Sequence, residues 1–379
     1  MVLKRSTQLA KPEYSAKVAK ALDKVYDQPS GWLARWRAKR RNLVEKAKLA
    51  DLKIVVMSDL HRGTGDKADD FRRSHRAYRA ALGWYLEQGY ALWLLGDVEE
   101  LWENLPREVI DHYKEVLRLE QGFISRGGLR RFYGNHDLDW SKPRTARKYL
   151  HEWVGSTPII ESLRLEVTDG DAPLGTLFFV HGHQGTPGSD VFAPISRLAV
   201  RFVWRAVQRS QGWIATTPAE SADIRGNHDA AMFEWAKSRA GRDPKHKRPL
   251  LIAGHTHHPV FPGEPPLPPS DDQVAALKAE LDTETDPATR AQLRAELNLA
   301  EAIRWEPPFD PPSNSPPCYV NTGCCSFPDA DITCIEITDE IRLVRWLDNE
   351  GNARPHSFDP LSLRDLFAEI NADPAPAPG

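Results

Sequence analysis

Five short apolar segments, each followed within a few residues by Asp, Asn or His, constrain the fold of this chain more than any other feature. They span residues 53–57, 91–95, 129–133, 177–180 and 250–253. Their length and their content of β-branched residues predict buried strands. Helical periodicity occupies residues 71–88 and 109–124, which lie between the first three of these segments. The alternation predicts an α/β fold in which helices pack on the faces of a sheet.

The composition is that of a globular protein, because 41% of the 379 residues are hydrophobic and 27% are charged. No run of eighteen or more apolar residues occurs, and the first ten residues lack the apolar core of a secretion signal. We therefore expect a cytoplasmic protein. The four cysteines match no disulfide or metal spacing and are expected to be reduced; they are Cys318, Cys324, Cys325 and Cys334.

The charge is distributed unevenly along the chain. Residues 1–50 hold 13 Lys and Arg against 4 Asp and Glu, whereas the remainder holds 37 against 49. The pattern predicts a basic arm of two helical pieces that is broken at residues 28–31, with an apolar stripe at Trp32, Leu33 and Trp36. Such an arm would attract lipid headgroups, nucleic acid or the acidic body of the protein itself.

Two segments interrupt the alternation of strands and helices. Residues 187–249 carry helical stretches, and residues 262–317 carry an acidic helical pair between proline-rich flanks. Both are predicted to be helical insertions in a domain of residues 51–350, whose last strands follow the second insertion, from residue 319 to residue 346. The C-terminal segment, residues 351–379, ends in a Pro- and Ala-rich tail that is predicted to be disordered.

Each of the five predicted strands ends in side chains that bind metals. These are Asp59 and His61, then Asp97, then Asn135 and His136, then His181 and His183, and finally His255 and His257. Since ligands bind at the carboxyl ends of the strands in an open α/β sheet, the five loops are expected to meet in one crevice. Carboxylates mixed with imidazoles suit Mn, Fe or Zn, and an Asp can bridge two ions. The sequence therefore predicts a dinuclear metal site.

The five clusters and their order resemble the calcineurin-like metallophosphoesterase superfamily, whose pattern is DxH, GDxx(D/E), GNH(D/E), a lone His and GHxH. The resemblance covers about residues 53–260 and implies a β-sandwich flanked by helices. It also implies two divalent ions that share Asp97 as a ligand. The first ion would be held by Asp59, His61, Asp97 and His257, and the second by Asp97, Asn135, His181 and His255.

The same resemblance implies hydrolysis of phosphate esters or pyrophosphate bonds. A hydroxide that bridges the ions would attack phosphorus in line. His136 would protonate the leaving oxygen, and Glu100 would be the acidic partner of that histidine.

The place of the first insertion bears on the substrate class. It comes after the lone His and in this position alone resembles the branch of the superfamily that hydrolyses UDP-2,3-diacylglucosamine, whereas the acidic second insertion and the basic arm differ from that branch. The positional resemblance implies a nucleotide or a lipid-linked substrate. The alternatives are a nuclease, a cyclic-nucleotide phosphodiesterase and a non-enzymatic interaction scaffold. The acidic body argues against a nucleic acid partner, because it would repel a polyanion.

Several other residues are candidates for contact with the substrate. Arg62 follows the first cluster and Arg131 precedes the third, so both are candidate phosphate contacts, with a salt bridge as the alternative. His183 would contact phosphate or support a ligand. A second Gly-Asn-His-Asp sequence, residues 226–229, is expected to cap a helix through Asn227 or Asp229, with His228 as a substrate contact.

A basic stripe runs through the first insertion. Its residues are spaced by four and are Arg197, Arg201, Arg205 and Arg209. On an amphipathic helix this spacing forms one face. We expect a lid in which Arg201 and Arg205 contact an anionic and partly apolar substrate. The alternative is contact with an anionic membrane surface.

Overall fold

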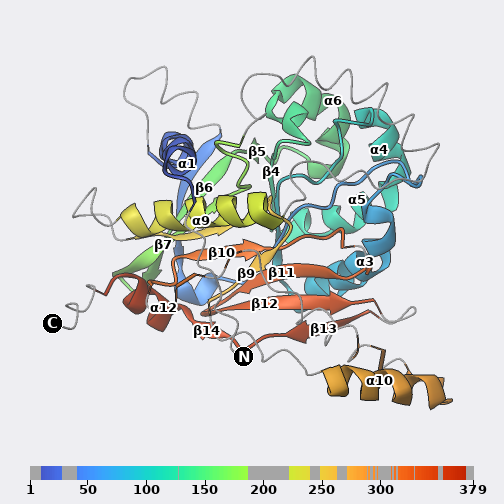
Figure 1. The fold of residues 1–379 in the computed structure, drawn as a ribbon. Helices are drawn as coiled ribbons and strands as arrows, with labels where there is room; N and C mark the ends of the chain where they lie inside the picture. Colours follow the sequence, from blue (N-terminus) through green and yellow to red (C-terminus); the bar gives the residue numbers. More distant parts are fainter. Residues whose placement is uncertain are drawn as a thin grey trace.

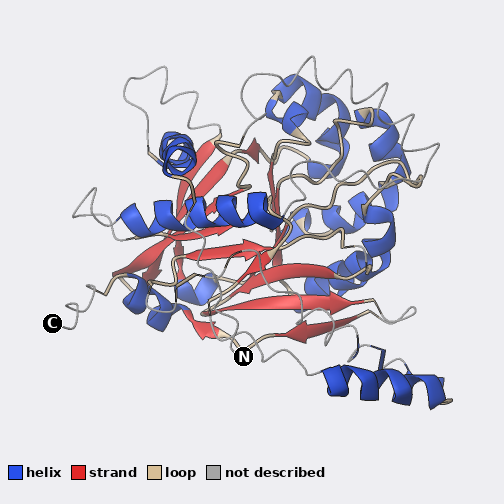
Figure 2. Cartoon of the chain, in the orientation of Figure 1, coloured by secondary structure: helices blue, strands red, loops and turns tan. Residues whose placement is uncertain are grey.

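Two mixed β-sheets pack face to face at the centre of the structure, with helices on their outer faces (Figure 1 and Figure 2). The computed structural model describes residues 10–27, 41–126, 128–186, 222–239, 248–262, 271–287, 315–327, 329–348 and 353–372, together with residues 289, 290, 293, 294, 297, 309, 311 and 312. The predicted α/β class is therefore confirmed.

The eight-stranded sheet contains the predicted alternation of strands and helices. Its order is β13 (Arg354–Ser357), β12 (Glu340–Leu347), β11 (Ile332–Ile337), β2 (Ile54–Met57), β3 (Ala91–Leu95), β4 (Leu129–Phe132) and β5 (Ile159–Ile160), and β14 (Leu361–Ser362) pairs with β12. Strands β2 to β5 are parallel. The helices between them are α3 (Phe71–Gln88), α4 (Pro106–His112), α5 (Lys114–Gln121) and α6 (Pro143–Val154).

The all-apolar sequence of β2 follows from burial on both faces of this sheet. Ile54 and Val56 join the core between the two sheets, whereas Val55 and Met57 join the core beneath helices α3 to α6. A strand that is covered on both sides has no solvent-facing position, so its hydrophobic residues run without interruption.

The six-stranded sheet supplies the other half of the sandwich. Its order is β1 (Asn42–Lys48), β6 (Ser162–Asp169), β7 (Ala172–Val180), β8 (Leu250–Ala253), β10 (Tyr319–Thr322) and β9 (Pro259–Val260). The rings of Trp93 on β3 and Phe179 on β7 lie 4.8 Å apart, centroid to centroid, where the two sheets meet. The helices that pack on this sheet are α1 (Pro12–Tyr26), α9 (Ala222–Ser238) and α12 (Leu363–Ile370).

The N-terminal region differs from the predicted arm of two helices. Helix α1 forms as expected, but residues 42–48 form strand β1, which pairs in parallel with β6 from Asn42–Ser162 to Lys48–Thr168. The prediction of a second helix ending near residue 50 is wrong because pairing with a distant strand overrides local propensity. Val18 and Leu22 of α1 are fully buried, so this helix is part of the core. Trp32, Leu33 and Trp36 lie outside the described residues.

The second Gly-Asn-His-Asp sequence also differs from its prediction. Residues 226–229 lie inside α9 and not at its start, so neither Asn227 nor Asp229 is an N-cap. The reason is tertiary, since His228 and Asp229 point into the protein and are buried there. Which residues of a long helix are buried depends on which face packs against the protein, and a four-residue motif does not reveal that face.

The two predicted insertions are described only in part. The basic stripe from Arg197 to Arg209, including Arg201 and Arg205, lies outside the described residues, as does the tail after residue 372. Within the second insertion, helix α10 (Asp271–Thr283) forms as expected. Among the helices that the structure describes, none is long and apolar enough to cross a bilayer.

The burial of α1 predicts the effect of truncating its core side chains. Leu22→Ala should lower the free energy of unfolding by about 2–5 kcal/mol, the usual cost of this change in a packed core. Leu105→Ala is the control, because Leu105 is 48% exposed and an exposed change costs less than about 0.5 kcal/mol. Urea unfolding followed by tryptophan fluorescence measures both. Equal effects would mean that α1 is an appendage and not part of the core.

Candidate metal centre

The loops after five strands meet at one edge of the sandwich and are joined by backbone hydrogen bonds. The N–H of Asp59 donates to the Gly96 carbonyl at 3.2 Å, and the N–H of His61 donates to the Asp97 carbonyl at 3.0 Å. In the other sheet, the N–H of Gly254 donates to the His181 carbonyl at 2.9 Å. The predicted convergence of the loops at the carboxyl ends of β2, β3, β4, β7 and β8 is therefore present in the fold.

The side chains in these loops form three groups that could each hold a metal ion. Within each group the candidate ligand atoms lie within 4.8 Å of one another; the groups are Asp59, His61 and His257, then His61, Asp97 and His136, and then Asp97, His181 and His255. The groups overlap, because Asp97 and His61 each belong to two of them. These groups contain every predicted histidine and aspartate ligand, and His136 in addition. Asn135, the remaining predicted ligand, directly precedes His136, whose N–H donates to Oδ1 of Asp97 at 2.8 Å.

The atoms that face one another in these groups are nitrogens and oxygens that bind metals. Nε2 of His61 lies 3.0 Å from Nε2 of His257, and Oδ1 of Asp59 lies 3.3 Å from the same atom of His257. Oδ2 of Asp97 lies 3.9 Å from Nε2 of His61 and 3.0 Å from Nε2 of His181. These nitrogens and oxygens converge on a small volume, as the ligands of a cation do.

Three buried polar atoms of the centre make no hydrogen bond of good geometry, although charged neighbours lie close to two of them. They are Oδ1 of Asp59, which is 3.3 Å from Nε2 of His257, Oδ1 of Asn135, and Nε2 of His181, which is 3.0 Å from Oδ2 of Asp97. Buried polar atoms are nearly always paired, so each exception needs an explanation. A bound cation would satisfy all three, and the chemistry of the donor set therefore fits a metal.

The backbone is strained at the same residues. In the part of the chain that the structure describes, six residues other than glycine have positive φ, and five of these are predicted ligands: Asp59 (53°), His61 (50°), Asp97 (49°), His255 (72°) and His257 (58°). Residues with a Cβ rarely adopt this conformation. Such strain gathers at functional sites, where the surrounding structure enforces it.

The electrostatics of the metal-free chain follow from burial and from neighbouring charges. Burial raises the pKa of the Asp97 carboxyl, but the charges of His181, His136 and His61 together outweigh burial and hold that pKa well below its usual value. Burial lowers the pKa of His181, whereas the charges of Asp97 and Asp59 together raise it to about 9. Burial and the charge of His181 both hold the pKa of His255 well below its usual value, so this imidazole is neutral, as a ligand must be.

His136 and Glu100 lie side by side at the edge of the centre. Nδ1 of His136 lies 2.5 Å from Oε2 of Glu100, which is also 3.1 Å from Nδ1 of His61. Burial lowers the pKa of His136, but the charges of Glu100 and Asp97 raise it to about 9. The Trp102 ring stacks on His136 at 4.1 Å, a contact that the sequence did not predict. Its only signal was an aromatic residue two positions after Glu100.

The prediction that Arg62 and Arg131 contact phosphate is corrected. Both side chains are fully buried, and they form ion pairs with Glu99 and Glu120. Glu120 lies on α5, and packing of that helix against the sheet brings its carboxylate between the two arginines. The guanidinium groups lie in the interior beneath the loops after β2 and β3. Because they are buried there, they are not available to contact a substrate.

The two histidines that were predicted to contact the substrate lie next to the metal-binding groups. His183 and His228 are buried beside the centre, with their rings 5.5 Å from His181 and 5.3 Å from His255 respectively. Burial and the charge of His181 lower the pKa of His183 to about 3. Asp229 was not predicted to belong to the site, yet its Oδ1 accepts a hydrogen bond from Thr256, which lies between two ligands.

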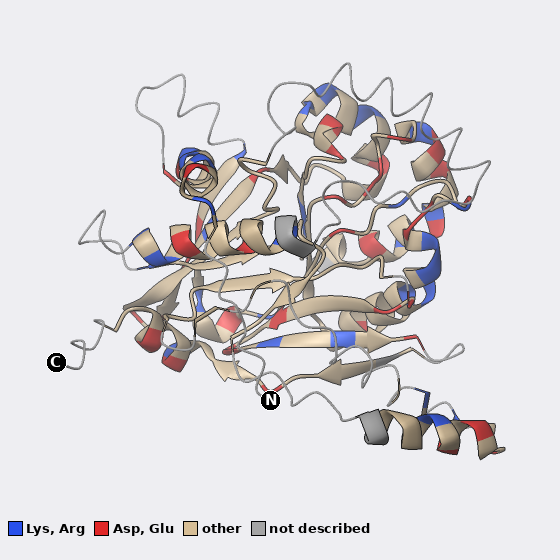
Figure 3. Ribbon diagram, viewed as in Figure 1, with Lys and Arg blue, Asp and Glu red and all other residues tan. Residues whose placement is uncertain are grey.

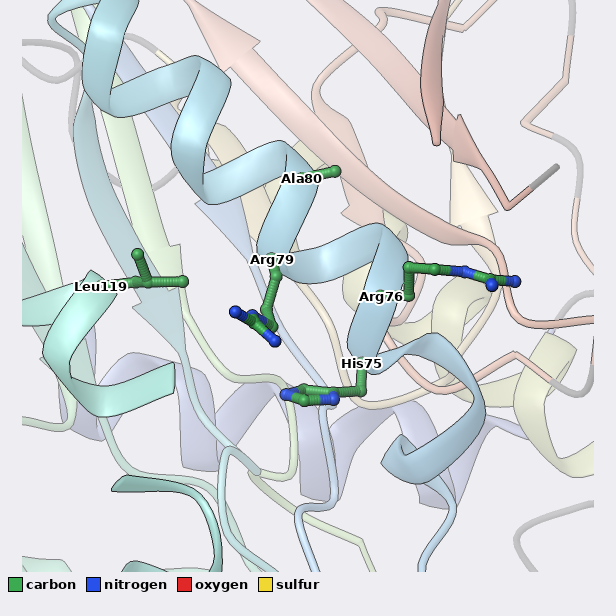
Figure 4. A pocket seen from close by; sticks show the side chains of 5 residues that line it. All are labelled: His75, Arg76, Arg79, Ala80 and Leu119. Carbon is green, nitrogen blue, oxygen red and sulfur yellow. The ribbon is translucent and has the colours of Figure 1, made fainter. Parts of the chain in front are cut away.

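A cavity elsewhere on the molecule does not coincide with this centre. Figure 4 shows that it lies between α3 and α5 and is lined by His75, Arg76, Arg79, Ala80 and Leu119. Arg76 pairs with Asp348 at 2.7 Å, and Arg79 lies 4.0 Å from Glu115. Figure 3 draws the Lys and Arg positions of α3 in blue. None of the lining residues belongs to the metal-binding groups.

Comparison with known proteins adds no assignment to this geometry. No protein-family model and no curated protein matches the chain.

The close packing of the centre predicts the effect of adding one methyl group to it. A Cβ at position 134 would overlap Oδ1 of Asp97 and lie 2.7 Å from the His181 ring, so Gly134→Ala should weaken Mn²⁺ binding by about 10- to 100-fold, as other changes next to ligands do. Gly83→Ala on α3 is the control, because a Cβ there meets nothing within 4 Å. Titration calorimetry with MnCl₂ compares the two variants, and equal affinities would show that this packing has no bearing on a metal.

Proposed function

We propose that the chain is a metal-dependent hydrolase of phosphate esters or pyrophosphate bonds, with the fold of a calcineurin-like metallophosphoesterase. One observation carries the proposal. Buried atoms of Asp59, Asn135 and His181 make no hydrogen bond of good geometry, and the five ligand candidates in the loops after β2, β3 and β8 have a strained backbone. A protein that used this fold only as a scaffold would gain nothing from such strain.

Two divalent ions fit this donor set, with Mn, Fe or Zn favoured by its mixture of carboxylates and imidazoles. Asp59, His61 and His257 would hold one ion, Asn135, His181 and His255 the other, and Asp97 would contact both. When bound, the ions would supply a water of lowered pKa and neutralise charge on the phosphoryl oxygens.

His136 would supply the proton to the leaving oxygen. Since its Nδ1 faces Oε2 of Glu100 at 2.5 Å, its Nε2 is the atom left to carry that proton. Glu100 fixes the tautomer, and the stacked ring of Trp102 fixes the plane of the imidazole. Glu100 and Trp102 would thus orient His136 as a general acid at the metal centre.

The substrate class proposed is a phosphorylated small molecule, with a nucleotide or a lipid-linked molecule as the leading candidates. Arg201 and Arg205 would contact such a substrate from the first insertion, and the same basic stripe could also contact an anionic membrane. A nuclease or cyclic-nucleotide phosphodiesterase would use the same centre. A panel of monoesters, diesters and pyrophosphates tested on the Mn-loaded protein would decide among these classes.

The shared carboxylate predicts the result of removing it. Asp97→Ala should abolish hydrolysis and the binding of both ions, whereas His61→Ala should weaken mainly one. Elemental analysis after gel filtration measures the metal content, which should be about two ions per wild-type chain. Asp111→Ala is the control, because Asp111 is an exposed aspartate that pairs with Lys114. Wild-type activity that survives treatment with a strong chelator would contradict the proposal.

A separate prediction isolates the general acid. His136→Ala should cost about 10²- to 10⁴-fold in kcat on esters with a poor alkoxide leaving group, and much less on a nitrophenyl ester, whose leaving group needs no proton. Metal content should remain that of the wild type in this variant. A loss of the same size on both substrates would assign His136 to metal binding or positioning.

A further inference from the structure

The second Gly-Asn-His-Asp sequence, on α9, contains a buried histidine that connects α1 to a loop of the metal centre. His228 on α9 is buried, and its Nε2 lies 2.5 Å from the carbonyl oxygen of Gly182. A carbonyl only accepts, so this nitrogen carries the proton and donates it. Nδ1 of His228 is then free to accept, and the hydroxyl of Tyr14 on α1 donates to it at 2.8 Å.

The Gly182 peptide is a sensitive point of the centre. It lies between His181 and His183 and has a φ of 113°. A Cβ at this position would come within 3.2 Å of the Gly254 carbonyl and of Cβ of His255. Because the two histidine loops touch here, a shift of the Gly182 carbonyl would move the ligands His181 and His255 together.

A second contact from α9 holds the other loop. Oδ1 of Asp229 accepts hydrogen bonds from Thr256 at 3.0 Å and from the Tyr319 hydroxyl at 2.6 Å. Thr256 lies between His255 and His257 in the chain. Successive residues of α9 therefore hold both histidine loops.

Helix α1 in turn fixes α9. Nε1 of Trp235 on α9 donates to Oδ1 of Asp23 on α1 at 2.8 Å, and Arg239 pairs with Asp23 at 2.9 Å. Helix α1 also touches the first histidine loop directly, since a Cβ at Gly185 would lie 2.7 Å from Cα of Val18. Tyr14 thus lies on a helix that contacts both α9 and the loop of His181 and His183.

We propose that Tyr14 is a positioning residue for the His181 and His255 side of the metal centre, and that it acts through His228 and the Gly182 carbonyl. The inference rests on the proposed function, because it assumes that these histidines bind an ion. Hydrogen-bond partners of the ligands themselves change metal affinity by about 10- to 100-fold when they are removed, and Tyr14, which acts through His228 and a backbone carbonyl, is expected to reach the lower end of that range.

The test is the affinity for Mn²⁺ of the full chain after removal of metal with a chelator, measured by titration calorimetry. Tyr14→Phe should weaken one of the two ions by about 10-fold or more. Tyr90→Phe is the matched control, since Tyr90 is also half-buried and its hydroxyl donates to Glu336 at 3.4 Å, far from the centre. This control should bind both ions as the wild type does.

Two double variants separate positioning from general loss of stability. With His257→Ala, which removes a ligand of the other ion, Tyr14→Phe should weaken the remaining ion to the same extent. With His255→Ala, Tyr14→Phe should have no further effect, because its target has already gone. Equal effects in both backgrounds, or unchanged binding by Tyr14→Phe alone, overturn the inference and leave the proposed function standing. A wild-type chain that binds no ion overturns both.

Discussion

The burial of the Asp97 carboxylate is the constraint on which the rest of the structure depends. Removing an ionised carboxylate from water costs several kcal/mol unless other charges and donors surround it. Oδ1 of Asp97 accepts the N–H of His136 at 2.8 Å, and Oδ2 lies 3.0 Å from Nε2 of His181. His136 follows β4 and His181 follows β7, which belong to different sheets. The carboxylate therefore has its partners only when the sandwich is closed, so packing and electrostatics impose the same arrangement.

Much of the fold could be predicted because its central strands are buried on both sides. Residues 54–57 are all apolar, and such an uninterrupted run is typical of a strand that is buried on both faces. Helix α3 has the predicted bounds of 71 and 88. Strand β1 was missed for the opposite reason. Its side chains are half-buried or exposed, and only its pairing with β6 makes it a strand. Local sequence carries no record of a partner so far along the chain.

The centre shows the same division. Its metal-binding candidates could be predicted because each follows a strand directly, and the strand ends fix where the loops go. Arg62 also follows a strand, but its environment is set by Glu120 on α5, so its burial could not be foreseen. His228 and Asp229 reach the centre through the inner face of a helix. The second Gly-Asn-His-Asp motif identified these two residues as candidates, but it did not indicate which face of α9 packs against the centre.

The pairing of β1 with β6 has a consequence for biosynthesis. Asn42 lies opposite Ser162, so β1 leaves the ribosome about 120 residues before the strand with which it pairs. The closure of so long a loop is slow and must precede the contacts that compensate for it. Until then the apolar side chains of α1 have no core to enter, and they are exposed to chaperones and to other nascent chains. The N-terminal segment is thus made early and docks late.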